Sequence, residues 1–336
     1  MKAEIRNVLS FSNIGERTNQ EDSCYYGQLS NGSYKPYFIL CDGMGGHDNG
    51  EVASSTVCEA LSTYFDNNVP QEDEINEDYF NNALEYAYEK LHEKDTNSSS
   101  NKMGTTLTCV YLCNRGAWCF HIGDSRIYHI RPCEYNPQEH STGLMFQSQD
   151  HSLVNSLLKA GELTEQEALT YPHKNVITRA MQPREGEHSK ADYRLEKDLQ
   201  EGDFFFLCSD GVLEQLDNEE LCSILADEET DDAGKLSAIE EVCKRGTKDN
   251  HTCILISLGP AQKHADGLKT KPAKSLRRGG RKRQRRRSPG NRFDNMMPWL
   301  VVAIVAILLF LVLWLDEINI SEAAGKVWDW IKPDGK

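Results

Sequence analysis

Acidic residues stand at the edges of apolar runs in four well-separated parts of the chain. They are Glu21-Asp22, Asp42-Gly43, Asp210-Gly211 and Asp249-Asn250. The apolar runs 36–41, 204–209 and 252–258 predict buried strands, so the neighbouring aspartates lie at strand ends. Several carboxylates within a few ångströms of one another cannot all stay ionised unless cations neutralise them. Oxygen ligands suit Mg²⁺ or Mn²⁺, and the spacing therefore predicts a metal site assembled from the whole length of one domain.

Other motifs fall in a fixed order around these acids. Arg17 precedes Glu21 by four residues, and the remaining motifs are Asp42-Gly43-Met44-Gly45-Gly46-His47, Gly104-Thr105-Thr106, Gly123-Asp124-Ser125-Arg126, Ser209-Asp210-Gly211 and Asp249-Asn250. A single Asp-Gly or Gly-Asp pair usually marks a turn, whereas the ordered set is far more specific. The set resembles the metal-dependent protein phosphatases of type 2C (the PPM family), in particular compact bacterial members with a DGMGG sequence. The resemblance covers about residues 8–258.

The resemblance implies an α+β fold and a binuclear Mn²⁺/Mg²⁺ centre at one end of it. The fold would be a four-layer α-β-β-α sandwich, with two antiparallel sheets flanked by helices. By position, Asp42 would bridge the two metals, and the carbonyl of Gly43 would ligate one of them. Asp210 and Asp249 would complete the other. The implied reaction is hydrolysis of phosphoserine and phosphothreonine in proteins by a water that bridges the two cations.

Four further residues take roles from the same resemblance. Glu21 would act through metal-bound water, and Asp22 would support the same set of ligands. Arg17 would hold the substrate phosphate, because its planar fork suits a tetrahedral dianion better than Lys does. Asp124 resembles the ligand of a third, weaker metal, although a Gly-Asp pair is also an ordinary hairpin turn.

Two positions depart from the family pattern. Many eukaryotic relatives have a His directly after the metal-binding Asp-Gly, where this chain has Met44. His47 is close in sequence, and water is the other candidate proton donor to the leaving group. Glu214 stands where relatives often have Asp for a third metal. Neither change removes a core ligand, so we expect activity.

Two other functions remain open at this stage. A membrane-bound pseudophosphatase would bind phosphoproteins or partners without turnover, but its expected mark is a lost ligand among Asp42, Asp210 and Asp249. A hydrolase of small phosphate esters is not excluded, because a metal centre recognises the phosphate and not its carrier.

The elements that must position these residues follow from apolar periodicity. The pattern predicts helices over about 50–65, 77–92, 218–226 and 232–245. A polar, partly helical segment at 150–182 interrupts the strands and corresponds to the flap of the family. The predicted strands are 37–42, 105–112, 117–122, 126–130, 203–209 and 252–258. Their grouping favours helices outside antiparallel sheets over a doubly wound parallel sheet.

Charge and cysteine content exclude some functions. The net charge of −15 conceals about +11 in residues 261–297 and −2 after Leu315, which leaves −24 for residues 1–260. Such a negative charge would repel the phosphate backbone, so residues 1–260 are not expected to bind nucleic acid. All eleven cysteines precede residue 261, and no CxxC pair occurs. Buried free thiols in a reducing compartment explain them better than disulfides or a zinc site.

The C-terminal part predicts a membrane anchor. We expect a phosphatase domain at 1–259, a basic linker at 260–295, a transmembrane helix at 296–315 and a short tail at 316–336. Residues 296–315 are uncharged and long enough to cross a bilayer. Eight Lys or Arg residues lie between 277 and 287, which places the domain in the cytoplasm by the positive-inside rule. The chain would be a single-pass membrane protein that acts on phosphoproteins, including a Ser/Thr kinase or its substrates.

Overall fold

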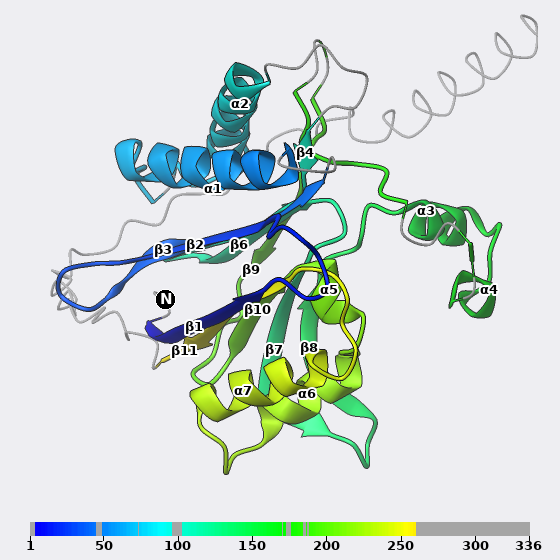
Figure 1. Cartoon of the computed structure of the whole chain (residues 1–336). Helices are drawn as coiled ribbons and strands as arrows, with labels where there is room; N and C mark the ends of the chain where they lie inside the picture. Colours follow the sequence, from blue (N-terminus) through cyan, green and yellow to red (C-terminus); the bar gives the residue numbers. More distant parts are fainter. Residues whose placement is uncertain are drawn as a thin grey trace, which may run out of the picture. The chain divides into compact units, whose positions relative to one another are not determined.

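Two antiparallel sheets packed face to face form the centre of the fold (Figure 1). The computed structural model describes residues 4–44, 49–72, 74–95, 103–169, 171–172, 176–183, 186 and 188–259. The four-layer α-β-β-α arrangement predicted from the sequence is present, since helices cover the outer face of each sheet.

The first sheet places the last strand of the domain between the first strand and strand Phe204–Cys208. Its strands follow the order β1 (Ile5–Asn13), β11 (His251–Leu258), β10 (Phe204–Cys208), β7 (Arg126–Asn136) and β8 (Ser141–Gln147). Every neighbouring pair is antiparallel. Strands from both ends of the domain therefore lie side by side, and residues far apart in sequence meet at one edge of the sheet.

The second sheet is built mainly from the first half of the chain. Its order is β2 (Asp22–Gln28), β3 (Tyr34–Met44), β5 (Leu107–Cys113), β6 (Gly116–Ile122) and β9 (Asp192–Glu196). A two-residue strand, β4 (Gly104–Thr105), pairs with the end of β3. All residues of β5 and β6 are buried, as expected for strands covered on both faces.

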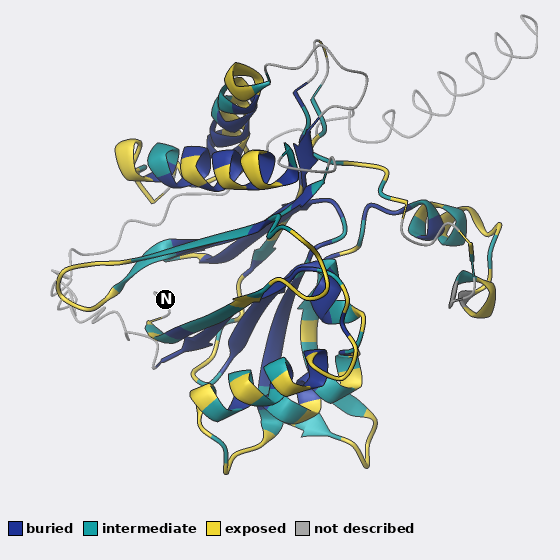
Figure 2. Cartoon of the chain, viewed as in Figure 1, coloured by how far each residue is buried: buried dark blue, intermediate teal, exposed yellow. Residues whose placement is uncertain are grey.

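The helices cover the two outer faces. The long pair is α1 (Asn49–Asn67) and α2 (Glu77–Lys94) on the second sheet, and the shorter pair is α6 (Asn218–Ala226) and α7 (Asp232–Cys243) on the first. Their buried faces point toward the sheets in Figure 2. Asp217 accepts a hydrogen bond from the Glu220 amide at 2.8 Å, which caps the N-terminus of α6. The remaining helices are α3 (Leu153–Ala160), α4 (Glu165–Leu169) and the short α5 (Asp210–Leu213).

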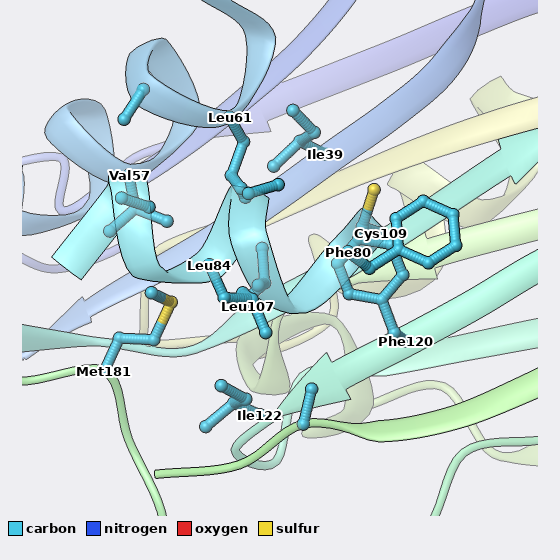
Figure 3. Packing of buried hydrophobic residues seen from close by; sticks show 14 of the residues in the cluster. Ile39, Val57, Leu61, Phe80, Leu84, Leu107, Cys109, Phe120, Ile122 and Met181 are labelled. Atoms are coloured by element: carbon cyan, nitrogen blue, oxygen red, sulfur yellow. The ribbon is translucent and has the colours of Figure 1, made fainter. Parts of the chain in front are cut away.

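Three apolar clusters hold the layers together. Figure 3 shows the outer one, where Leu61 of α1 and Phe80 of α2 pack on Ile39 and Phe120 of the second sheet. The cluster between the sheets contains Phe38, Leu40, Val110, Phe205, Ile254 and Ile256, all fully buried. Alternate residues of β3 enter different clusters because successive side chains of a strand point to opposite faces.

The cysteine prediction is confirmed, and the membrane prediction concerns residues that the structure does not describe. All eleven cysteines are free thiols, and nine of them are buried. No helix among the described residues is long and apolar enough to span a bilayer. The apolar run 296–315 lies outside those residues, as do the basic linker and the tail.

Candidate metal and phosphate site

Asp22 and Asp42 lie opposite each other at one end of the second sheet. The antiparallel register of β2 and β3 pairs these two residues directly. Hydrogen bonds hold the Asp42 backbone on its other side, since its amide donates to Thr106 Oγ1 at 3.0 Å and its carbonyl accepts from Thr105 Oγ1 at 2.9 Å. Thr105 and Thr106 of the Gly-Thr-Thr motif therefore fix the main chain of Asp42.

Asp210 and Asp249 reach the same end from the first sheet. Asp210 begins α5 directly after β10, and Asp249 stands two residues before β11. β10 and β11 are paired and lie side by side (Figure 1). The charge of Asp249 therefore acts on Asp210. Burial raises the pKa of Asp210, and the charge of Asp249 raises it further. The two sheets thus bring acids from distant parts of the sequence to one end of the fold, and the metal site inferred from their spacing stays a prediction.

The clustered carboxylates are strongly perturbed. Burial raises the pKa of Asp42 well above its usual value, and the charges of Asp22, Asp210 and Asp124 add to the shift. Burial raises the pKa of Asp22 to about 7, although a hydrogen bond from Ser209 opposes it. Burial and the charge of Asp210 raise the pKa of Asp124 to about 7 as well. Burial is the main physical cause, and the like charges of neighbouring carboxylates add to it.

The oxygen atoms of this cluster fit hard divalent cations. Asp22 Oδ1 and Asp124 Oδ1 are buried and have no hydrogen-bond partner among the residues that the structure describes. A buried charged oxygen without a partner is costly, and a cation would remove that cost. The cluster offers oxygen atoms only, which is the ligand chemistry of Mg²⁺ and Mn²⁺. In the described parts of the chain no three His, Cys, Asp or Glu side chains surround a common point with metal-ligand geometry.

Glu21 and Gly43 are bound together through their backbones. The Gly43 amide donates to the Glu21 carbonyl at 3.1 Å, and Ser54 Oγ donates to the same oxygen at 2.6 Å. A Cβ at Gly43 would overlap the backbone of Gly50 at the start of α1, so only glycine allows this approach. The carboxylate of Glu21 packs against Gly50, since a Cβ there would lie 2.7 Å from its Cδ.

Arg17 lies at the exposed rim of the cluster. Its Nη2 is 2.5 Å from Asp249 Oδ2, and 58% of its side chain is exposed. The hydrogen bond to Asp249 raises the pKa of Arg17, so the guanidinium stays charged. The predicted phosphate ligand therefore stands next to a predicted metal ligand, with its cation accessible from solvent.

The two departures from the family pattern fall on different parts of the structure. Met44 ends β3 and is half-buried, while His47 lies outside the described residues. Glu214 is exposed, and its Oε2 accepts a hydrogen bond from the Lys248 amide at 2.8 Å. Glu214 thus supports the loop that carries Asp249.

The structure adds residues to which the sequence assigned no role. Ser209 is fully buried and donates to Asp22 Oδ2 at 2.8 Å, while its hydroxyl accepts from the Thr252 amide at 3.0 Å. Thr106 Oγ1 lies 2.7 Å from Ser125 Oγ and so links the strand beside Asp42 to the turn that carries Asp124. Ser209 and Ser125 are sequence neighbours of Asp210 and Asp124, and Thr106 belongs to the Gly-Thr-Thr motif, so motif membership was the available signal.

Known proteins share both this sequence pattern and this fold. The family model for protein phosphatase 2C matches residues 11–232. Protein phosphatase PhpP of Streptococcus pneumoniae is 33% identical over 253 residues, which cover 74% of this chain and 95% of that protein.

Solved structures agree with the match. The serine/threonine phosphatase PstP/Ppp of Mycobacterium tuberculosis superimposes with a TM-score of 0.61 at 29% identity, over 75% of this chain and 98% of that one. The catalytic domain of the phosphatase PstP in complex with two manganese ions gives a TM-score of 0.59 at 27% identity, with the same coverage of both chains. The chain therefore belongs to the protein phosphatase 2C family.

Proposed function

We propose that this chain is a metal-dependent phosphatase that hydrolyses phosphoserine and phosphothreonine in proteins. The observation that carries the proposal is the convergence of Asp22, Asp124 and Asp210 on the buried Asp42, whose pKa is raised by burial and further by the charges of these three acids. Carboxylates whose pKa values are raised by burial and by one another are concentrated at functional sites. The family match supplies the reaction class.

The residues take the roles that the motif order suggests. Asp42, the Gly43 carbonyl, Asp210 and Asp249 would hold two cations, and Asp124 is the candidate ligand of a third. Glu21 and Asp22 would orient the bound water and the other carboxylates.

The cations are Mn²⁺ or Mg²⁺ in this proposal. When bound, they lower the pKa of water and neutralise phosphate oxygens, which is the chemistry that hydrolysis of a phosphomonoester requires. The manganese-bound PstP domain supports this choice of metal.

Arg17 would bind the substrate phosphate. Its charged guanidinium is exposed at the rim of the acid cluster, where a phosphate dianion would arrive. Two parallel N–H donors can bind two phosphate oxygens at once, which orients the phosphorus relative to the cluster. The phosphate carrier would be a phosphoprotein, and a Ser/Thr kinase or its substrates are the expected partners. The names of PhpP and PstP as protein phosphatases support that expectation.

Hydrolysis of a phosphothreonine peptide tests the proposal. We expect activity with Mn²⁺ or Mg²⁺, none with EDTA, and a loss of at least about 100-fold in kcat/KM for Asp210→Asn, which removes one ligand charge. Calorimetric titration of the same variant with Mn²⁺ should show weakened binding. Asp217→Asn is the matched control, because Asp217 caps α6 away from the acid cluster.

The same assay separates the alternatives. Full activity in EDTA, or in Asp210→Asn, would refute the metal mechanism. Binding of the phosphopeptide without turnover at any metal concentration would indicate a pseudophosphatase. Turnover of a simple aryl phosphate together with failure on all phosphopeptides would indicate a hydrolase of small esters.

The flap, residues 150–182, would contribute to substrate choice. A pocket of about 450 Å³ lies between α3 and β8. Lys159 lends positive charge to its wall, Arg126 and Asp150 form an ion pair there at 2.7 Å, and Asn155 and Gln149 lend hydrogen-bonding groups. Replacement of the flap by that of a relative should change the preference among phosphopeptides. An unchanged preference would contradict this role.

The C-terminal part would tether the domain to a membrane. The proposal keeps a phosphatase domain at 1–259, a basic linker at 260–295, a membrane span at 296–315 and a tail at 316–336. It rests on the uncharged run and on the eight basic residues before it. The catalytic domain would then face the cytoplasm, which agrees with its eleven free thiols.

A further inference from the structure

Asn250 uses every hydrogen-bonding atom of its side-chain amide. Its Oδ1 accepts from the Glu21 amide at 2.7 Å, while its Nδ2 donates to the carbonyls of Ile14 at 2.8 Å and Asn19 at 3.0 Å. The residue is only 4% exposed, so water does not compete for these bonds. One buried side chain therefore binds three backbone groups that belong to a single segment, residues 14–21.

Segment 14–21 carries two of the proposed functional residues. Arg17 lies in its middle and Glu21 at its end, and the three bonds from Asn250 hold both ends of the segment. The backbone amide of Asn250 also donates to Asp249 Oδ1 at 2.8 Å. The same residue thus sets the phosphate ligand, an outer acid and a metal ligand relative to one another.

The segment is otherwise held by polar contacts, which include the bonds from the Gly43 amide and Ser54 Oγ to the Glu21 carbonyl and the ion pair of Arg17 with Asp249. Residues 14–18 are exposed, so apolar packing contributes little there. The Glu16 amide donates to the Lys248 carbonyl at 2.9 Å, and Gly15, with φ of +62°, lies against the carbonyl of Asp249. These contacts are to the chain directly before Asn250. An exposed segment held by a few hydrogen bonds opens locally when its anchors are removed.

We propose that Asn250 is a positioning residue that places Arg17 and Glu21 for the reaction. The proposal rests on the proposed function for what Arg17 does, but the clamp itself is a structural property. Misplacement of a binding group by about 1 Å can cost roughly 100-fold in rate, so loss of the clamp should act on the enzyme much as loss of Arg17 does.

Hydrogen exchange in the metal-free protein tests the clamp without any catalysis. In Asn250→Ala, the amides of Glu16 and Glu21 should lose protection by about tenfold or more, since their segment opens more often. Asn76→Ala is the control, because Asn76 caps α2 with a bond to the Tyr79 amide and touches no part of the segment. Unchanged protection in a folded Asn250→Ala protein would overturn the proposal.

A double-mutant cycle with Arg17→Ala tests the consequence for catalysis. Asn250→Ala should lower kcat/KM by about 10–100-fold, and Arg17→Ala should then cost much less in that background than alone. If Arg17→Ala lowers kcat/KM by the same factor in the Asn250→Ala protein as in the wild type, Asn250 does not act through Arg17. Should Asn250→Ala fail to fold, Asn250→Asp carries both tests, because it keeps the shape and the acceptor but loses both donors. An inactive wild type would refute the proposed function, while the exchange result would still decide the clamp.

Discussion

At the scale of single residues, the buried acids that the proposed function requires lower the stability of the metal-free fold. Asp22 is 6% exposed, its Oδ1 has no partner, and the pKa of its carboxyl is raised to about 7 by burial. A residue in this state destabilises the metal-free fold at neutral pH. A ligand that binds only the folded state restores the stability that such a residue removes. A divalent cation bound to Asp22 and its neighbours would do this here.

Asp22→Asn should therefore stabilise the metal-free domain in alkaline solution. The pKa of Asp22 is about 7 in the fold and 3.8 ordinarily, so folding takes up a proton between these values. Wild-type stability then falls as pH rises from about 4 to 7, and the deficit is complete above about pH 7. We expect Asp22→Asn to gain about 2–4 kcal/mol at about pH 8 and little at about pH 4. Urea denaturation in EDTA measures both values.

Asp66, a carboxylate whose pKa is lowered in the fold, supplies the control. Burial alone would raise the pKa of Asp66, but hydrogen bonds from Lys35 and Tyr37 outweigh it and lower the pKa. Asp66→Asn should accordingly lose stability at about pH 8. If Asp22→Asn raised the free energy of unfolding equally at about pH 8 and about pH 4, the charge on Asp22 would not be the source of the instability.

The motif residues could be predicted at this scale, but the residues that hold them could not. An acid at the end of an apolar run is chemically unusual, and this pattern identifies Asp42, Asp210 and Asp249 in the sequence. Ser209 and Asn250 were part of the motifs, yet their type does not reveal their partners. Asn250 contacts residues more than 200 positions away in the sequence, and only the pairing of β1 with β11 brings them together.

At the scale of elements, the turn between β6 and β7 connects the flap to the acid cluster. Gly123 has φ of +111°, a conformation that favours glycine, and it directly precedes Asp124. His151 binds both backbone groups of Gly123, because its Nδ1 accepts from the Gly123 amide at 3.1 Å and its own amide donates to the Gly123 carbonyl at 2.8 Å. His151 stands at the base of the flap, so the position of Asp124 depends on a contact from that segment.

Gly123→Ala should destabilise the domain more than backbone strain alone explains. A Cβ at Gly123 would lie 2.7 Å from both Cβ and Cγ2 of Thr106, in addition to the strain of positive φ. We expect a loss of about 2–4 kcal/mol, measured by urea denaturation. Gly202→Ala is the matched control, because Gly202 has φ of +89° but nothing within 4 Å of its Cβ position. Equal losses in the two variants would mean that the contact with Thr106 is easily relieved.

The strands that the sequence failed to predict share one physical property. The six predicted strands correspond to β3, β5, β6, β7, β10 and β11, which occupy the interior of the sheets. The missed strands β1, β2, β8 and β9 are the four edge strands. Edge strands are half-buried and carry polar residues, as the Asp22–Gln28 strand illustrates, so they lack the apolar run that marks a central strand. The four helices that cover the sheets were predicted to within a few residues, whereas the four-residue α5 was not predicted.

At the scale of the whole molecule, a buried ionic network joins the two sheets. His129 of β7 is fully buried, and its Nε2 lies 2.9 Å from Asp203 Oδ2, while its Nδ1 lies 3.3 Å from Glu196 Oε2 of β9. Arg131 binds the other oxygen of Asp203 at 2.9 Å. Burial alone would lower the pKa of His129, but its bonds to the two carboxylates outweigh that effect and raise it.

His129→Gln should destabilise the domain in a pH-dependent way. A His whose pKa is raised in the fold contributes its full stability below about pH 6.5 and loses it as pH rises through the folded pKa. We expect a loss of about 3 kcal/mol at about pH 6 and a smaller loss at about pH 9. His188→Gln removes a more exposed pair with Glu85 and should cost under about 1 kcal/mol. If His129→Gln lowered the free energy of unfolding equally at about pH 6 and about pH 9, His129 would be neutral in the fold.

The phosphatase domain should be separable from the C-terminal part. All three apolar clusters lie between Val8 and Leu258, and the Gly259 amide donates to the Glu4 carbonyl at 2.6 Å, which closes the first sheet next to its N-terminal strand. Contacts group residues 1–267 into one compact unit. A chain that ends at residue 267 should therefore keep the unfolding midpoint and kcat/KM of the full chain.

The same truncation decides whether the C-terminal part does more than anchor. Full-length chain should sediment with phosphatidylcholine vesicles, and the chain ending at residue 267 should remain in the supernatant, because it lacks the apolar run 296–315. A chain ending at residue 250 is the negative control for folding, since it lacks β11, which pairs with both β1 and β10 at the centre of the first sheet. Vesicle binding by the chain ending at 267 would place the membrane contact on the domain itself. A folded but inactive truncation would show that residues beyond 267 take part in the reaction.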